Sequence, residues 1–341
     1  MNFVVINNGK LMAAGNGLKI GKNNNILYSE FISVHDGVDS ISIGANFCFL
    51  LMRNGRLKYI GMNDYILSNP ILSFTYADTL NYLSVYSGFY HAIAIRSDFS
   101  LYSVGDNTYG QLGLGNTNNN YNFLQKIGTN SWVKASAGLF HSAGIDYLGN
   151  LYTWGGNSSG ELGLGDTNTR LSPTIVPGGY RWVDVHCGNG FTIAIKDDLS
   201  IWGAGVYSRI GSGAPGYSTS FVQLISGKWK AISCGFSYTI GIKTDGTMYS
   251  WGSTNHRGQL GNGTYGTSGS TYPVQIGVNK KWANCLATKL PNPFSYAISD
   301  DGELYVWGDN LYGELGINSS DSIITSPTYA MRDCFVKRGI V

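Results

Sequence analysis

The chain carries little charge and has no long apolar run. Charged residues make up 13% of the 341 positions, and the formal net charge is +2. Nucleic-acid binding needs clustered Lys and Arg, which are missing, so we expect no nucleic-acid partner. A membrane-spanning helix needs roughly 18 apolar residues, and a signal peptide needs a basic segment before a long apolar one. The sequence shows neither, so we expect no membrane span and synthesis in the cytoplasm without a signal peptide.

Cysteine and histidine are also scarce. The cysteines form no CxxC pair, and their odd number argues against a disulfide framework. The histidines lack the spacing of metal ligands, and no Ser or carboxylate pattern beside them suggests a catalytic set. We therefore predict no metal, no cofactor and no catalytic residues. The cysteines are Cys48, Cys187, Cys234, Cys285 and Cys334.

An internal repeat fills the chain. Each copy is marked by a glycine that ends an apolar run after a turn, as in LGNLYTWG and TDGTMYSWG. By subtraction, successive markers lie 44 to 56 residues apart, which is the period of solenoids and propellers. The marker glycines are Gly15, Gly61, Gly105, Gly155, Gly203, Gly252 and Gly308.

Small and large residues alternate in one five-residue run of each repeat, for example HAIAI at 91–95 and FTIAI at 191–195. A period of two predicts a β-strand with two different faces. Neither face is charged, so we expect the bulky face of one repeat to pack against the thin face of the next. A turn and a second strand follow, a WxxV/I strand precedes, and another strand comes after the glycine-rich turn GQLGLG. Each repeat therefore contributes four strands.

Seven such repeats predict an all-β fold, a seven-bladed β-propeller of four-stranded antiparallel blades that forms a single domain over residues 1–341. The first repeat lacks its WxxV/I strand, and the C-terminal DCFVKRGIV matches that missing segment. We therefore expect the N- and C-terminal strands to share one blade and to close the ring. Such closure removes an exposed sheet edge.

The pattern GxxHxxAI, followed by DGxLYxWGxNxxGQLGLGD, resembles the repeat of the regulator of chromosome condensation family. The resemblance is strongest over 91–116, 141–166, 238–263 and 294–318, and a weaker register extends over essentially the whole chain. It implies the propeller fold. Members serve as guanine-nucleotide exchange factors, ubiquitin-ligase accessory domains, a plant ultraviolet photoreceptor, enzyme inhibitors and bacterial or phage interaction modules, so the fold leaves the function open.

The GxxH loops separate these functions. In the exchange factors, the resemblance implies that acidic and histidine residues of these loops grip a GTPase at one rim. The loop pairs of this chain are Ala45-Asn46, Phe89-Tyr90, Leu139-Phe140, Asn189-Gly190, Phe236-Ser237 and Ile340-Val341, and none contains a carboxylate. A photoreceptor would need clustered Trp beside Arg, whereas the Trp of this chain fall at repeat positions and are expected to pack within the framework.

The same loops bring apolar and aromatic side chains to one mouth of the ring. Aromatic anchors on a rigid scaffold are typical of recognition surfaces. The alternative is that the first residue of each pair packs beneath its neighbour. We predict a partner-binding surface formed by Phe89, Tyr90, Leu139, Phe140, Asn189, Phe236, Asn46 and Ile340.

These features favour a non-catalytic recognition or docking module that binds a protein or a glycan. The composition, rich in Asn, Gly, Tyr and Ser, looks like that of bacterial or bacteriophage modules. Our specific hypothesis is therefore a virion or tail-associated attachment component within a larger assembly. The alternative is an exchange factor for a small GTPase. A carbohydrate-active enzyme, the third option, would need paired carboxylates across the central mouth.

Some features depart from the repeat. Residues 206–219, 262–273 and 286–294 are irregular, and irregular loops on a regular scaffold often carry specificity, although neutral variation explains them nearly as well. His91 and His141 open their strands and are expected to have structural, hydrogen-bonded roles. GQLGLG and GELGLG look superficially like phosphate loops, but they lack the Lys-Ser/Thr and the following helix, so we expect no phosphate site.

Overall fold

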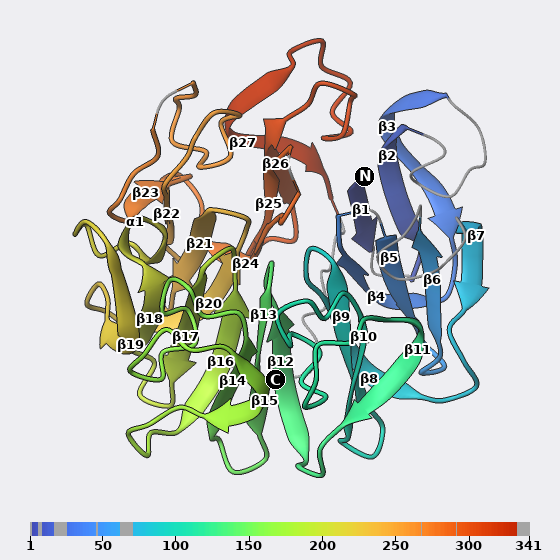
Figure 1. Cartoon of the computed structure of the whole chain (residues 1–341). Helices are drawn as coiled ribbons and strands as arrows, with labels where there is room; N and C mark the ends of the chain where they lie inside the picture. The colour runs from blue at the N-terminus through green and yellow to red at the C-terminus, as the bar shows by residue number, and fades with distance from the viewer. Residues whose placement is uncertain are drawn as a thin grey trace.

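The computed structural model describes residues 2–5, 9–16, 26–45, 47–61, 71–266, 268–290 and 292–332. These residues form small antiparallel sheets arranged in a ring, together with the four-residue helix α1 (Tyr207–Ile210) (Figure 1). Within these ranges no helix combines the length and the apolar character needed to cross a membrane.

The strands follow the sequence in order around the ring. The first sheet contains β1 (Asn2–Val5), β2 (Leu11–Asn16) and β3 (Leu27–His35). Blade 2 contains β4 (Val38–Ile43), β5 (Phe47–Met52), β6 (Leu57–Gly61) and β7 (Ile71–Tyr76). Blade 3 contains β8 (Tyr82–Ser87), β9 (His91–Arg96), β10 (Leu101–Gly105) and β11 (Asn120–Ile127). Blade 4 contains β12 (Trp132–Ala137), β13 (His141–Asp146), β14 (Leu151–Gly155) and β15 (Arg170–Ile175).

The remaining blades repeat this order. Blade 5 contains β16 (Trp182–Cys187), β17 (Phe191–Lys196), β18 (Ile201–Val206) and β19 (Tyr217–Gln223). Blade 6 contains β20 (Trp229–Cys234), β21 (Tyr238–Lys243), β22 (Met248–Gly252) and β23 (Val274–Ile276). Blade 7 contains β24 (Trp282–Ala287), β25 (Phe294–Ser299), β26 (Leu304–Asp309) and β27 (Ile323–Met331).

The fold class is confirmed as an all-β propeller with four-stranded antiparallel blades, but the count of such blades needs correction. The described residues form six four-stranded blades beside a three-stranded first sheet, whereas the sequence predicted seven blades of four. The strand that we expected to complete the first sheet falls within residues 333–341, outside the described residues. The sharing of one blade by both termini therefore stays a prediction.

The ring nevertheless closes between blade 7 and the first sheet, which lie side by side in Figure 1. Glu30 of β3 forms an antiparallel bridge with Ile317. The Asn318 backbone N–H donates to the carbonyl of Ser29 over 3.1 Å, and Phe31 packs with the apolar cluster of blade 7. We call these contacts the seam.

The core lies between neighbouring blades, because the two faces of the second strand differ as the alternation predicted. Ala92 and Ala94 of β9 pack against the bulky face of β5, whereas Ile93 and Ile95 pack against the first strand of blade 4. Most tryptophans fill the same interfaces, and the Trp132 and Trp154 ring centroids lie 5.9 Å apart. The framework role predicted for tryptophan is confirmed.

The first strand of each complete blade lines the axis of the ring, and its fifth residue alternates between serine and a larger side chain. The serine Oγ accepts a hydrogen bond from a backbone N–H of the next blade: Cys187 N donates to Ser136 Oγ over 2.9 Å, and Ala287 N donates to Ser233 Oγ over 3.0 Å. The larger residues occupy the axis between them. In chain order the six positions are Ser42, Tyr86, Ser136, His186, Ser233 and Leu286.

The turns between second and third strands all require a left-handed backbone. Gly55, Gly246 and Gly302 adopt φ of 79°, 83° and 78°, which glycine tolerates. In blades 3 and 5 the residue is instead Phe99, with φ 65°, or Leu199, with φ 68°. Residues with a Cβ are strained in this left-handed backbone conformation.

Candidate partner-binding site

The loops between first and second strands surround one end of the axis, and we call this end the aromatic mouth. Backbone hydrogen bonds join consecutive loops. A Cβ at Gly88 would lie 2.4 Å from the carbonyl oxygen of Gly138, so this close approach requires glycine. The joining bonds run from Ala45 N to Phe89 O (3.1 Å), Phe89 N to Gly138 O (3.0 Å), Leu139 N to Gly188 O (3.2 Å) and Asn189 N to Phe236 O (3.0 Å).

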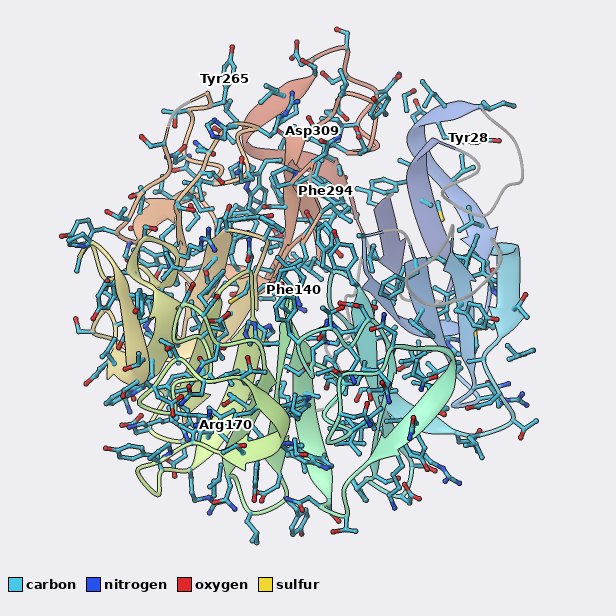
Figure 2. All side chains as sticks on the ribbon, in the orientation of Figure 1. Tyr28, Phe140, Arg170, Tyr265, Phe294 and Asp309 are labelled. Carbon is cyan, nitrogen blue, oxygen red and sulfur yellow. The ribbon has the colours of Figure 1, made fainter. Side chains whose placement is uncertain are left out.

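Five aromatic rings form a continuous chain of contacts across the mouth. Phe236 of blade 6 meets Phe89 of blade 3 with ring centroids 5.6 Å apart. Phe89 contacts Tyr90 at 4.6 Å, and Tyr90 stacks on Phe140 at 6.2 Å. Tyr109, from the β10–β11 loop, extends the chain by contacting Phe140 at 4.7 Å. In Figure 2, Phe140 lies near the middle of the ring, whereas Tyr28, Arg170 and Tyr265 lie farther out.

The exposure of the predicted residues divides them into two groups. Phe89 is only 9% exposed and serves as packing beneath its neighbours, in line with the alternative given for the first residue of each pair. Tyr90, Leu139, Phe140, Asn189 and Phe236 are half-buried and still present surface. Asn46 and Ile340 lie outside the described residues. Tyr109, 44% exposed, was missed because it comes from a different loop of the repeat.

Carboxylates also lie near the GxxH pairs, although none belongs to them. Glu161 is buried, and burial raises the pKa of its carboxyl. Arg209 of α1, in the irregular segment 206–219, is close enough to oppose that rise, and its guanidinium donates to the Asn189 carbonyl. Asp309 is buried as well, and burial followed by the charge of Glu314 raises its pKa to about 6.

The two strand-opening histidines have the structural role that was predicted. His91 Nε2 lies 2.9 Å from Ser142 Oγ of the next blade, and His141 Nε2 lies 2.9 Å from Thr192 Oγ1. Burial, followed by the charge of Lys289, lowers the pKa of both imidazoles to about 3, so both are neutral at pH 7. Within the described ranges no three His, Cys, Asp or Glu side chains gather as a metal site, and the four described cysteines are free and buried.

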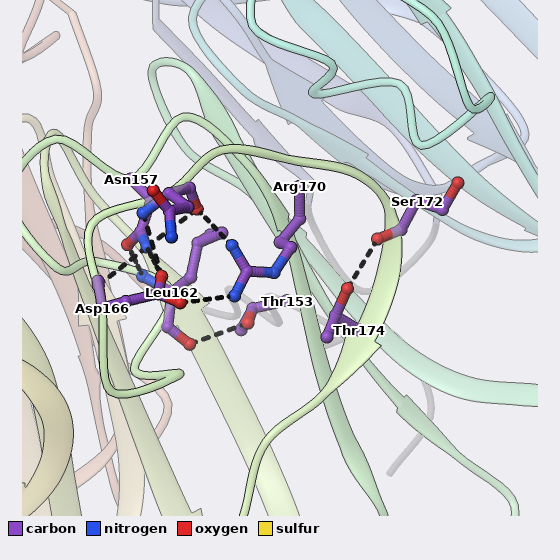
Figure 3. Close-up of polar contacts among 8 residues, drawn as sticks. Thr153, Asn157, Leu162, Asp166, Arg170, Ser172 and Thr174 are labelled. Carbon is purple, nitrogen blue, oxygen red and sulfur yellow. Dashed lines mark hydrogen bonds and ion pairs between the residues drawn. The ribbon is translucent and has the colours of Figure 1, made fainter.

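The GELGLG loop of blade 4 is organised around an asparagine that sequence reasoning overlooked (Figure 3). Asn157 Nδ2 donates to the carbonyls of Asp166 and Asn168 at 2.9 and 3.0 Å, and its Oδ1 accepts from Leu162 N at 3.0 Å. Arg170 closes the loop through Asp166 at 2.7 Å. Asn107, Asn255 and Asn310 accept the equivalent backbone hydrogen bond in their blades. The glycine-rich turn thus wraps a side chain of the protein itself.

The other irregular segments lie against different parts of the ring. Gly213 N donates to the Thr271 carbonyl over 3.1 Å, so segments 206–219 and 262–273 contact each other. Tyr265 and Tyr272 of the second segment are 57% and 61% exposed. In segment 286–294, Lys289 reaches across the axis beneath the mouth and donates to the Ala137 carbonyl.

Comparison with known proteins gives matches to models of the regulator of chromosome condensation (RCC1) repeat. One such model matches residues 100–145 and 149–195, and a second matches 83–111, 132–161 and 229–259. The human E3 ubiquitin-protein ligase HERC2 is 30% identical over 280 residues, which cover 79% of this chain and 6% of that protein. The mouse protein of the same name matches equally. The chain thus spans a small fraction of these curated relatives.

Solved structures share the fold. Human WBSCR16 superposes with a TM-score of 0.78 at 19% identity, covering 90% of this chain and 85% of that one. Prp20p from Saccharomyces cerevisiae, described together with its binding properties to Gsp1p and histones, superposes with a TM-score of 0.81 at 16% identity, covering 97% and 88%. At these identities the likeness concerns the architecture of the ring.

Proposed function

Because the chain belongs to the regulator of chromosome condensation repeat family, we propose that it is a non-catalytic docking module that binds a protein partner at the aromatic mouth. The observation that carries the proposal is the chain of four contacts among five aromatic rings, on a row of loops from blades 2 to 6 that are joined by backbone hydrogen bonds. Aromatic side chains supply a large contact area at small entropic cost, and a rigid backbone limits what is lost on binding.

The tyrosines give the surface a polar component. Tyr90 and Tyr109 add hydroxyls beside the apolar rings of Phe140 and Phe236, and Asn189 adds an amide. Such a mixture suits a protein with its own apolar anchor, and it also permits stacking on the apolar face of a sugar. A protein is the preferred partner because Prp20p, which has this fold, is described as binding Gsp1p and histones.

The test compares capture of partners from the native source by the wild-type chain and by a Tyr90→Ala, Phe140→Ala, Phe236→Ala variant. Phe89 stays unchanged because it is buried. We expect the variant to lose a specific partner by about 10-fold or more, as removal of central aromatic anchors does elsewhere. A glycan array with the same two proteins tests the sugar alternative.

A Tyr147→Ala, Leu148→Ala variant is the matched control. These residues are 73% and 71% exposed in the β13–β14 turn, at the other end of the strands from the mouth. The control removes similar apolar surface and should capture the partner normally. Equal capture by the mouth variant, or equal loss in the control, contradicts binding at the mouth.

Exchange-factor activity is the second candidate. Its support is the shared architecture with Prp20p and three buried carboxylates: Glu161 and Glu314 lie in the loops between third and fourth strands, and Asp309 ends β26. Nucleotide release from candidate small GTPases measures it directly. Release accelerated by this chain would overturn the non-catalytic assignment.

A more specific proposal is attachment within a virion or a phage tail. It is supported by the low charge and by the loops rich in Asn, Gly and Tyr. Mass spectrometry of purified particles from the native source would find the chain in stoichiometric amount if the proposal holds. Particles without the chain would refute it.

A further inference from the structure

A cavity of about 160 Å³ lies on the axis directly beneath the aromatic mouth. Its wall comes from the ends of the first strands, including Tyr86 and Ser87 of blade 3, Ser136 of blade 4 and His186 of blade 5. The volume is similar to that of an engineered protein cavity that holds benzene, and it is ample for several waters or a small solute.

Lys289 crosses this cavity from the irregular segment of blade 7. Its ammonium donates to the carbonyl of Ala137 and lies 3.4 Å from the carbonyl of Ser87, at the ends of first strands on the opposite side of the axis. Two of its three N–H groups are thereby directed at carbonyls. The irregular segment 286–294 thus places the Lys289 side chain at the axis of the ring.

No carboxylate of the described residues pairs with Lys289, and burial lowers the pKa of its amino group. The described lining of the cavity contains Lys134 and Lys289 and no carboxylate. Asp184 lies nearby, but its Oδ1 already pairs with Lys134 Nζ at 2.8 Å and lies 3.1 Å from His186 Nε2. Burial raises the pKa of the neighbouring Cys187 thiol to about 11 and also raises that of Cys234, so both thiols are neutral at pH 7.

Two hydroxyls add donor capacity to the same wall. Ser87 Oγ is buried and has no hydrogen-bond partner among the described residues. The Tyr86 hydroxyl makes no hydrogen bond of good geometry there, although Ser84 and the Ala135 backbone lie close enough to lower its pKa. Buried polar groups are normally hydrogen-bonded. Burial raises the pKa of Tyr86 to about 12, so its hydroxyl keeps its proton and can donate.

We propose that the axial cavity binds a small monovalent anion, such as a halide, between the ammonium of Lys289 and the hydroxyls of Tyr86 and Ser87. Burial lowers the pKa of Lys289, and a bound anion would favour its protonated form, because the low dielectric strengthens the attraction between opposite charges. A cation would instead meet two lysines. The site is independent of the partner proposed for the mouth.

The direct test uses bromide and the full chain. Anomalous diffraction from bromide-soaked crystals should place a peak within hydrogen-bonding distance of Lys289 Nζ. In solution, line broadening of the ³⁵Cl NMR signal measures chloride binding, and displacement by bromide measures competition. We expect saturable binding by the wild-type chain and a loss of affinity of about 10- to 100-fold in Lys289→Met, which removes a charge-assisted hydrogen bond.

Lys230→Met is the matched control. Lys230 lies on the first strand of blade 6, is partly exposed and contacts Asp300 at 3.9 Å, so its removal changes the net charge equally without touching the cavity. Binding should be unchanged in this control. If Lys289→Met fails to fold, chloride affinity is measured on Ser87→Ala instead, and we expect that variant to bind chloride about fivefold or more weakly. Non-saturable binding by the wild type, or equal affinity in the Lys289 or Ser87 variant and the control, overturns the proposal.

Discussion

At the scale of single residues, the buried histidines couple folding to pH. His91 and His141 titrate in the unfolded chain near 6.5 but in the folded chain only at about 3. Between these values the unfolded state binds more protons, so stability is full above pH 6.5 and falls as the pH drops toward 3. We expect the free energy of unfolding to decrease by about 2 kcal/mol per histidine between pH 7 and pH 5.

The measurement is urea unfolding as a function of pH. A His91→Phe, His141→Phe variant uses the residue that opens the equivalent strand at Phe191 and Phe47. A change in packing alters the free energy of unfolding already at pH 7.5. The slope of that free energy against pH between 6.5 and 4 measures the protons taken up on unfolding. A slope as steep as that of the wild type would show that other groups dominate acid unfolding.

Asp309 provides a second residue-scale prediction. In blade 3 the equivalent Asp106 accepts a hydrogen bond from Gln111 Nε2 at 2.5 Å, but in blade 7 the position of that glutamine is occupied by Glu314. Asp309 Oδ1 instead lies 3.7 Å from Arg257. Its pKa, raised to about 6, means that its protonated form favours folding and that this contribution disappears as the pH rises from about 4 through 6.

We therefore expect Glu314→Gln to raise the free energy of unfolding at pH 7.5 by about 1 kcal/mol or more, because the amide donates where a carboxylate repels. At pH 4, where Asp309 is protonated, the gain should nearly vanish. Denaturant titrations at both pH values check this. Gln111→Glu is the reciprocal control and should be destabilising at pH 7.5. If Glu314→Gln raises the free energy of unfolding equally at both pH values, repulsion between the Asp309 and Glu314 carboxylates is not its cause.

At the scale of elements, the hairpin turns of blades 3 and 5 store strain. Phe99 and Leu199 hold the left-handed conformation that glycine adopts at Gly302. Replacing either with glycine should raise the free energy of unfolding by about 1 kcal/mol, since relief of the Cβ clash exceeds the added entropy of the unfolded chain. Thermal melting checks it, with Gly302→Ala as the converse, because a Cβ there meets nothing within 4 Å and tests φ alone. No gain in either glycine variant would mean that the side chains repay the strain through contacts.

Elements were also what the sequence predicted best. The alternation of HAIAI or FTIAI follows from a period that any strand must obey, and it identified which face is thin. The loop asparagines, such as Asn157, were not predicted, because a hydrogen bond within a loop depends on a backbone path that composition does not specify. Tyr109 was missed for a similar reason, since two loops of different origin converge only in space.

At the scale of the whole molecule, the seam decides whether the ring unfolds as one unit. Phe31 of the first sheet packs on blade 7, and a Cβ at Gly316 would lie 2.6 Å from its ring. We expect Phe31→Ala to destabilise the protein by about 2 kcal/mol, because a half-buried aromatic contributes less than a fully buried one. Loss of the seam should lower protection in every blade, since each blade packs on both neighbours.

Hydrogen exchange resolved by peptide measures that protection. Tyr147→Ala is the control: Tyr147 lies at an exposed turn far from the seam, and its replacement should leave the protection of every blade unchanged. Faster exchange confined to blade 7 and the first sheet would show that the ring opens locally. The sequence predicted a toroid, but it could not predict that Lys289 spans the axis, because the reach of one side chain matters only once the diameter of the ring is known.

The alternation of serine with a larger residue along the axis groups the complete blades into tandem pairs, Ser42 with Tyr86, Ser136 with His186 and Ser233 with Leu286. Single repeats are therefore not interchangeable parts. Duplicating one repeat during evolution would put two large side chains next to each other at the axis, where they clash, or two serines next to each other, which leaves a cavity. Duplications or exchanges that move an even number of repeats would preserve the order, and engineered chimaeras of this protein should be cut at pair boundaries.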